Sequence, residues 1–158
     1  MKYIFDANIL IRSNRIDFGK DKDEFDDFLD WIFSLIKSGV IVFPECVYDE
    51  ISSGKDTLAE WCKEHVKKYK IDDSLAAPWL QKVLEAYEAK DSKSLEVIKS
   101  DAFIIAHALA CGGTIVTYEK ESNATSAINK KIPSVCEKLG IPCITLPFFI
   151  WRLKKQNS

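Results

Sequence analysis

Four short apolar segments, separated by longer stretches of helical periodicity, constrain the fold more than any other feature of the chain. They cover residues 3–6, 40–43, 114–118 and 143–146, are rich in β-branched and aromatic residues, and are bounded by glycine, proline or polar residues. We interpret them as strands. Because strands that alternate with helices form parallel sheets, the sequence predicts an α/β fold with helices on both faces of a parallel sheet.

Two regions between these segments have helical spacing. Apolar residues recur at i, i+3, i+4 and i+7 over residues 25–36, and Gly39 stands just past the end. Residues 57–99 lack a strand signal and show the same spacing, which predicts a helical insertion at about 57–99. A length of 158 residues with 47% hydrophobic content suits one compact domain over residues 1–158.

Several classes of protein do not fit this sequence. No apolar run approaches the roughly 20 residues needed to cross a bilayer, and the N-terminus lacks the pattern of a signal peptide, so we expect a cytoplasmic protein without a membrane partner. The five cysteines are scattered and never spaced as C-x-x-C, which indicates neither disulfides nor a zinc ribbon. His65 and His107 lie in apolar-periodic segments, and we assign them structural roles.

Two acids follow the first two predicted strands. Asp6 stands at the carboxyl end of the first strand, where open α/β folds bind their ligands, although it could equally serve as the N-cap of the next helix. Glu50 lies in the helix after the second strand, on the side of Val47 and Ile51, whereas Asp49 points away from that side. Glu50 is therefore the carboxylate that we expect to face the sheet, if it is more than a boundary residue.

Two further acids lie near the third predicted strand. Asp101 opens the apolar helical segment 101–110, where it is either a partner of the helix dipole or a carboxylate aimed into the cleft. Glu119 directly follows the strand 114–118. Glu121 and Asn123 stand close enough in sequence to replace or assist it.

Together these acids gather negative charge at one edge of the sheet, which requires a cation. Carboxylate oxygens without histidine or cysteine favour Mg²⁺ or Mn²⁺ over zinc. Such an ion activates water for attack on phosphorus and offsets charge on the leaving oxygen. The residues therefore point to hydrolysis of phosphodiester bonds.

At these positions the chain resembles PIN domains, a family that includes the VapC toxins. The four ordered motifs of that family are matched by IFDANIL (4–10), VYDEI (47–51), SDAFIIAHA (100–108) and VTYE (116–119). The segment KIPSVC (131–136) resembles a further signature of a PIN-like subfamily of unknown function. The resemblance runs from Tyr3 to about Leu146, and the order and spacing of the motifs carry it.

The resemblance implies a three-layer α/β/α sandwich and endoribonuclease activity. It implies that Mg²⁺ or Mn²⁺ is held by Asp6, Glu50, Asp101 and Glu119, which would be both the metal-binding and the catalytic residues. Asn8 and Thr117 match positions that orient the acids. Glu119 departs from the aspartate that is usual in the fourth motif, so its role as a direct ligand is the least secure. A VapC-like toxin also implies a protein antitoxin that covers the cleft, and a homodimer.

An RNA substrate requires local basic patches, because the net charge is −2. Arg15 and Lys131 follow motif-bearing segments and are the RNA contacts that we expect, ahead of the other basic candidates. Three of the four tryptophans fall in apolar-periodic segments, which favours a core or interface role over stacking on bases. The other basic candidates are Arg12, Lys120, Lys130, Arg152, Lys154 and Lys155.

Two other functions are compatible with parts of the sequence. A phosphatase could use Asp6 as nucleophile, but position 8 is asparagine where such an enzyme places its second acid. A PIN-fold interaction module without activity would keep the acids only as helix caps. Dependence on Mg²⁺ distinguishes the nuclease from the module.

Overall fold

The computed structural model describes residues 1–120 and 122–157, and its centre is a four-stranded sheet in which all strands are parallel. The strand order is β2-β1-β3-β4. Each predicted strand is present, although each is shorter than its apolar segment. The strands are β1 (Tyr3–Phe5), β2 (Ile41–Val42), β3 (Thr114–Val116) and β4 (Cys143–Ile144).

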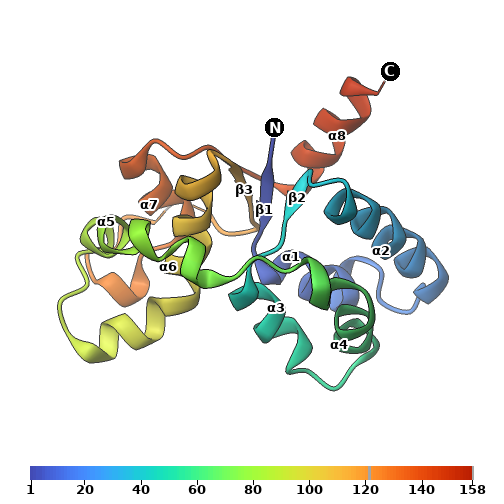
Figure 1. Cartoon of the computed structure of the whole chain (residues 1–158), viewed down its shortest axis with the longest axis horizontal. Helices are drawn as coiled ribbons and strands as arrows, with labels where there is room; N and C mark the ends of the chain where they lie inside the picture. The colour runs from blue at the N-terminus through green and yellow to red at the C-terminus, as the bar shows by residue number, and fades with distance from the viewer. Residues whose placement is uncertain (121, 158) are drawn as a thin grey trace.

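Helices cover both faces of this sheet, so the fold is the three-layer α/β/α sandwich (Figure 1). One layer contains α2 (Lys22–Lys37) and α8 (Leu146–Gln156), and the other contains α5 (Ala77–Tyr87), α6 (Ser92–Cys111) and α7 (Ile132–Leu139). Between the layers, α1 (Ala7–Arg12) continues from β1, and α3 (Glu45–Ser52) packs against α1, α6 and α4 (Thr57–Trp61). Short helical turns complete the chain at Ser13–Asp17 (η1), Cys62–Val66 (η2), Lys67–Tyr69 (η3), Asp73–Leu75 (η4) and Ala127–Asn129 (η5).

The alternation of side chains along β1 explains why both of its faces are covered. Tyr3 and Phe5 point to one face, where the ring of Phe149 in α8 lies edge-on to both, at centroid distances of 4.9 and 5.0 Å. Ile4 points to the other face, toward Gly113 at the end of α6. Because β1 is buried on both faces, the residue that follows it is held inside the protein.

The third motif lies on a longer helix than the sequence predicts. Instead of beginning at Asp101, α6 begins at Ser92, where the N-cap Asp91 accepts a hydrogen bond of 2.7 Å from the backbone N–H of Ser94. It ends as expected at Gly112, which adopts the left-handed conformation with φ 66°. Asp101 therefore lies in the middle of α6, and the interpretation that it is a partner of the helix dipole is wrong, since the dipole acts only in the terminal turns.

Residues 57–99, predicted as a helical insertion, contain α4, α5 and the short turns between them, and residues 92–99 are the first part of α6. Within this region, Ile71 forms a single parallel bridge to Pro44 and so prolongs the edge of the sheet beyond β2. Pro44 itself is the N-cap of α3.

Most of the apolar residues form one core. A single cluster of buried side chains extends from Tyr3 to Leu153 and includes residues of α1 to α8 and of β1, β2 and β3, and the partly buried residues of β4 pack against it. All five cysteines are free thiols, as the sequence predicts. Within residues 1–120 and 122–157, no helix is both long and apolar enough to span a membrane.

Candidate active site

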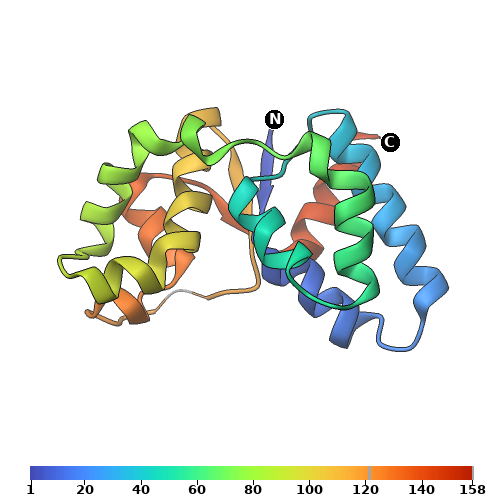
Figure 2. The ribbon, with the colours of Figure 1, turned by 60° about the horizontal axis from the view of Figure 1, so that its bottom comes forward.

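The carboxyl ends of the strands form the edge at which the predicted acids are found (Figure 2 turns this edge toward the viewer). Asp6 follows β1, and Glu119 lies three residues beyond the end of β3. Asp101 comes from the middle of α6 and Glu50 from the last turns of α3. We call these four residues the acid edge.

Asp6 is the most deeply buried member of the acid edge, with 3% of its surface exposed. One carboxylate oxygen accepts the backbone N–H of Asn8 at 3.4 Å, and the other accepts the Thr117 hydroxyl at 3.0 Å. Both donors are neutral, and none of the described cations forms an ion pair with Asp6. Burial and the nearby charge of Glu119 raise its pKa from 3.8 to about 6, against the opposing effect of the two hydrogen bonds.

The two residues expected to orient the acids contact Asp6 in different ways. Thr117 donates to Asp6 and accepts the backbone N–H of Glu119 at 3.1 Å, so its hydroxyl joins the two strand ends. The side chain of Asn8 is exposed, and only its backbone N–H contacts Asp6. Any residue other than proline would supply that N–H, so the contact does not explain an asparagine at position 8.

Asp101 is partly buried, and the other three acids lie close enough to raise its pKa. Burial is the main cause that raises its pKa from 3.8 to about 7, followed by the charges of Glu119, Asp6 and Glu50. The charge of Lys131 acts in the opposite direction. A partly buried carboxylate in the middle of a helix, surrounded by like charges, has no capping role that would account for its place.

Glu119 is anchored away from the strand that carries it. One of its carboxylate oxygens accepts the backbone N–H of Ile132 at 2.9 Å, at the start of α7. No local sequence pattern predicts this contact, because the two residues are 13 positions apart. Asn123, a candidate to replace or assist Glu119, is exposed, and Glu121 lies outside the described residues.

Glu50 is the only exposed member of the acid edge. Desolvation nevertheless raises its pKa, and its charge contributes to the raised pKa values of Asp6 and Asp101. Its side chain therefore lies at the solvent-exposed rim of the acid edge. Asp49, the neighbouring acid, is also exposed, and both line a groove between α3 and α6.

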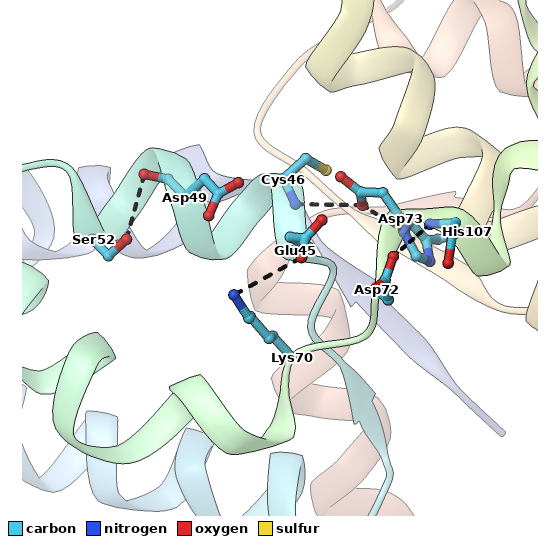
Figure 3. A network of polar contacts seen from close by, with 9 residues as sticks. Glu45, Cys46, Asp49, Ser52, Lys70, Asp72, Asp73 and His107 are labelled. Atoms are coloured by element: carbon cyan, nitrogen blue, oxygen red, sulfur yellow. Dashed lines mark hydrogen bonds and ion pairs between the residues drawn. The ribbon is translucent and has the colours of Figure 1, made fainter.

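This α3–α6 groove, of about 670 Å³, is acidic, and a network of polar contacts pairs several of its side chains (Figure 3), whereas the buried hydroxyl of Ser100 has no hydrogen-bond partner among the described residues. Asp73 accepts the backbone N–H of Cys46 at 3.4 Å and lies 2.9 Å from Nε2 of the buried His107. Glu45 lies 3.9 Å from the ammonium of Lys70. His107 thus has the structural role predicted for it, as the partner of Asp73.

Tyr87, which sequence reasoning missed, adds a buried hydroxyl near the acid edge. Its side chain is fully buried, and its hydroxyl has no hydrogen-bond partner among the described residues. Burial and the charges of Asp101 and Glu119 raise its pKa. A buried hydroxyl without a partner is unfavourable by several kcal/mol in an apolar setting, so its position beside the acids favours a polar ligand there.

Lys130 is a structural residue and not an exposed candidate for RNA binding. Its ammonium is buried, donates to the backbone carbonyl of Tyr87 at 2.8 Å and pairs with Glu88 at 2.8 Å. It thereby fixes the end of α5, where Glu88 adopts a positive φ of 60°. This role cannot be predicted from the local sequence, because the lysine contacts residues more than 40 positions away.

The two expected RNA contacts differ in their relation to the acid edge. Lys131 is exposed at the N-cap of α7, and its charge lowers the pKa of Asp101, so it lies beside the acids. Arg15 is exposed on η1. Among the described residues, no ion pair or hydrogen bond joins Arg15 to the acid edge.

The donors of the acid edge suit a hard divalent cation, although they do not form a closed metal cage. In the part of the chain that the structure describes, no three carboxylate, imidazole or thiol side chains converge closely enough to hold an ion as they stand. Mg²⁺ normally keeps several waters and uses one or two carboxylates, which is a requirement that Asp6 and Asp101 can meet. The acid edge therefore suits a divalent cation through its oxygen donors, its unpaired negative charge and the unpartnered Tyr87 hydroxyl.

Comparison with known proteins identifies a family but no function. Residues 3–156 match the family described as Domain of unknown function (DUF4411). Neither the curated proteins nor the solved structures gave a match. Because the family match covers nearly the whole chain, this chain belongs to the DUF4411 family.

Proposed function

We propose that this chain is a metal-dependent endoribonuclease of the PIN-domain type, which hydrolyses RNA phosphodiester bonds with Mg²⁺ or Mn²⁺. The observation that carries the proposal is the pair of carboxylates at the carboxyl edge of a parallel sheet, the buried Asp6 and the partly buried Asp101. The charge of Asp6 raises the pKa of Asp101, the charges of Glu119 and Glu50 raise the pKa of both, and neither has an ion-pair partner among the described residues. Ligands of open α/β sheets bind at this edge.

The cost of gathering these charges argues for a cation and against a purely structural role. Buried like charges destabilise a fold unless a counter-ion compensates them, and proteins retain such sites where function requires them. In the proposal, Asp6 and Asp101 hold the ion, while Glu50 and Glu119 act at its rim, directly or through water. Thr117 keeps Asp6 in place through its 3.0 Å hydrogen bond.

When bound, the metal would lower the pKa of a water for attack on phosphorus and offset charge on the leaving oxygen. The protein contributes a carboxylate edge whose opening is flanked by Lys131. That ammonium lies near enough to lower the pKa of Asp101, and it would contact a phosphate of the bound RNA. The rest of the proposal, a cytoplasmic toxin with a protein antitoxin and a homodimeric state, is carried by the resemblance to VapC-like PIN domains.

The rival functions explain less of the acid edge. A phosphatase with Asp6 as nucleophile would need a proton donor two residues later, and the exposed amide of Asn8 cannot supply a proton in that way. An inactive interaction module would keep the acids as helix caps. Asp6 does cap α1, but Asp101 lies in the interior of α6 and caps nothing.

RNA cleavage by the purified protein tests the proposal. Unstructured RNA should be cut internally in Mg²⁺ or Mn²⁺ and remain intact in EDTA. Asp6→Asn and Asp101→Asn should remove the activity, whereas Asp49→Asn should retain it as the matched control. Cleavage that persists in EDTA, or that is unaffected by Asp6→Asn, would refute the proposal, and an acid-stable phosphoprotein would favour the phosphatase.

A further inference from the structure

A second groove shares no lining residue with the α3–α6 groove. It has a volume of about 730 Å³ and runs between η1, α2 and α8. Its walls are largely aromatic and aliphatic, and they include Phe18, Tyr118, Ile150 and Trp151. We call it the α8 groove.

The α8 groove begins next to the acid edge. Tyr118, which lines it, directly follows Thr117, whose hydroxyl donates to Asp6. Arg12, which also lines it, ends the helix that Asp6 caps, and a helix of six residues is about 9 Å long. A chain bound with one phosphate at Asp6 would therefore reach the groove with its next nucleotides.

The charges of the two grooves are opposite. The described residues that line the α8 groove include two cations, Arg12 and Lys154, and one carboxylate, Asp17. That carboxylate accepts the Tyr118 hydroxyl at 2.7 Å, and the two cations outnumber it. The α3–α6 groove, by contrast, is lined by one cation, Lys99, and by five acids: Glu45, Asp49, Glu50, Asp73 and Glu96. Phosphates are therefore favoured on the α8 side and repelled on the other.

Aromatic rings and cations lie together along the α8 groove. The guanidinium of Arg12 lies 4.3 Å from the ring centroid of Tyr118. On α8, Phe148 and Trp151 stack at 5.4 Å and 18°, and remain 42% and 53% exposed. Beside the groove, Arg152 lies over Phe148 at 4.9 Å, and Lys155 lies over Trp151 at 5.0 Å. Exposed rings that alternate with cations form the platforms on which proteins bind single-stranded nucleic acids.

From these observations we propose that the α8 groove binds the single-stranded RNA that flanks the cleaved phosphate, with phosphates on Arg12 and Lys154 and a base stacked on Trp151 in place of the Lys155 ammonium. The inference rests on the proposed function for the identity of the ligand. To the proposed function it adds the direction in which the RNA leaves the acid edge and the requirement for an unpaired strand. It also assigns RNA contacts to residues outside the PIN-like motifs. An apolar protein segment is the competing occupant, and it would use the apolar wall without requiring phosphate contacts.

The test measures RNA binding without cleavage. A fluorescein-labelled RNA of about 12 unstructured nucleotides is titrated with the full-length protein in EDTA, and anisotropy reports binding. Trp151→Leu keeps an apolar side chain but removes the ring, and it should weaken binding about 5- to 100-fold. Trp79→Leu is the matched control, because Trp79 is 40% exposed on α5 in the other layer of the sandwich, and it should leave affinity unchanged.

A second variant tests the phosphate contact independently of stacking. Arg12→Gln should reduce the slope of log affinity against log salt by about 0.7, the value expected for one phosphate contact with a single strand. A duplex of the same sequence should bind more weakly than the single strand. Equal affinity of Trp151→Leu and wild type, an unchanged salt slope in Arg12→Gln, or no binding by the wild type would each overturn the inference.

Failure of this inference can be distinguished from failure of the proposed function. If the wild type cuts RNA but Trp151→Leu binds as tightly as Trp79→Leu, the nuclease assignment stands and the α8 groove is not its RNA site. If the protein binds RNA through Trp151 and Arg12 but never cuts it, the groove assignment stands and the nuclease assignment fails.

Discussion

Two buried charged regions of this molecule differ in whether the fold supplies an oppositely charged partner. At the end of α5, the ammonium of Lys130 donates to the carbonyl of Tyr87 and to the carboxylate of Glu88, both at 2.8 Å. At the acid edge, the carboxylate of Asp6 is equally buried but accepts hydrogen bonds only from neutral groups, and its close charged neighbours are other acids. The fold satisfies the first charge by itself and leaves the second for an external partner.

This difference separates structural from functional use of buried charge. A buried charge that is fully paired stabilises local geometry, and its removal should damage the fold. A buried charge that its neighbours repel lowers stability, and its removal should spare the fold and damage function. Asp73 and His107 belong with Lys130 in this respect, since they pair with each other at 2.9 Å.

The largest expected effect is on cleavage. Asp6→Asn and Asp101→Asn should each reduce the rate of RNA hydrolysis on the order of 10³-fold or more, because loss of a metal-holding carboxylate removes several kcal/mol of transition-state stabilisation. Single-turnover cleavage in Mg²⁺ measures the loss. Lys130→Met, examined at a temperature where it is folded, should cut RNA at a rate near that of the wild type. A comparable loss in Lys130→Met would erase the distinction between the two regions.

The next effect is on stability at the paired site. Lys130→Met leaves the buried Tyr87 carbonyl without its donor, which should lower the free energy of unfolding by about 1 to 3 kcal/mol. Urea unfolding followed by circular dichroism measures it. Lys138→Met is the control, because that exposed lysine donates to the carbonyl of Ala86 at 3.1 Å, and its loss should have little effect. Equal stability of the two variants would contradict a structural role for Lys130.

The pH dependence of the metal-free protein should reveal the acid edge. Because the pKa of Asp6 is raised to about 6 and that of Asp101 to about 7, the folded state binds protons more tightly than the unfolded state. This contribution to stability is complete below about pH 4 and is lost as pH rises toward 7. Thermal melts in EDTA across this window measure it. In the Asp6→Asn, Asp101→Asn double variant the decline should become much shallower, and an unchanged decline would assign it to other groups.

The smallest effect expected is a gain in stability at the acid edge. Asp101→Asn in EDTA at pH 8 should raise the free energy of unfolding on the order of 1 kcal/mol, because one pKa unit corresponds to about 1.4 kcal/mol and the buried amide offsets part of the gain. Aspartate and asparagine have similar helix propensities, so α6 itself should be unaffected. Asp49→Asn on the exposed side of α3 is the control. A clear loss of stability in Asp101→Asn would show that its charge is structural.

Local sequence signals were sufficient for the sheet and for two of the acids. A strand with β-branched residues that ends in an acid places that acid at the edge of a parallel sheet, and this applies to both Asp6 and Glu119. The sequence predicts the start of α6 too late because six of the nine residues 92–100 are polar, and apolar residues dominate only from Ala102 onward.

Features that depend on tertiary contacts could not be predicted in this way. The pairing of Lys130 with the end of α5 joins residues 43 positions apart, and no local pattern marks a lysine as buried. The approach of the Tyr87 hydroxyl to the acids depends on how α5 packs against α6 and α7. The helical periodicity of α3 predicts that Glu50 lies on the side of the sheet. It does not predict that Glu50 is exposed, because its exposure depends on the open groove beside α3.

Direct titration of the divalent cation tests the central claim that the unpaired acids form a metal site. Isothermal calorimetry with Mn²⁺ at pH 8, above the raised pKa values, should detect one site per chain in the wild type and in Asp49→Asn, and none of comparable affinity in Asp6→Asn or Asp101→Asn. Lowering the pH to 5.5 should weaken binding, because both carboxylates then take up protons. Absence of binding in the wild type, or equal binding in Asp6→Asn and Asp101→Asn, would contradict the account.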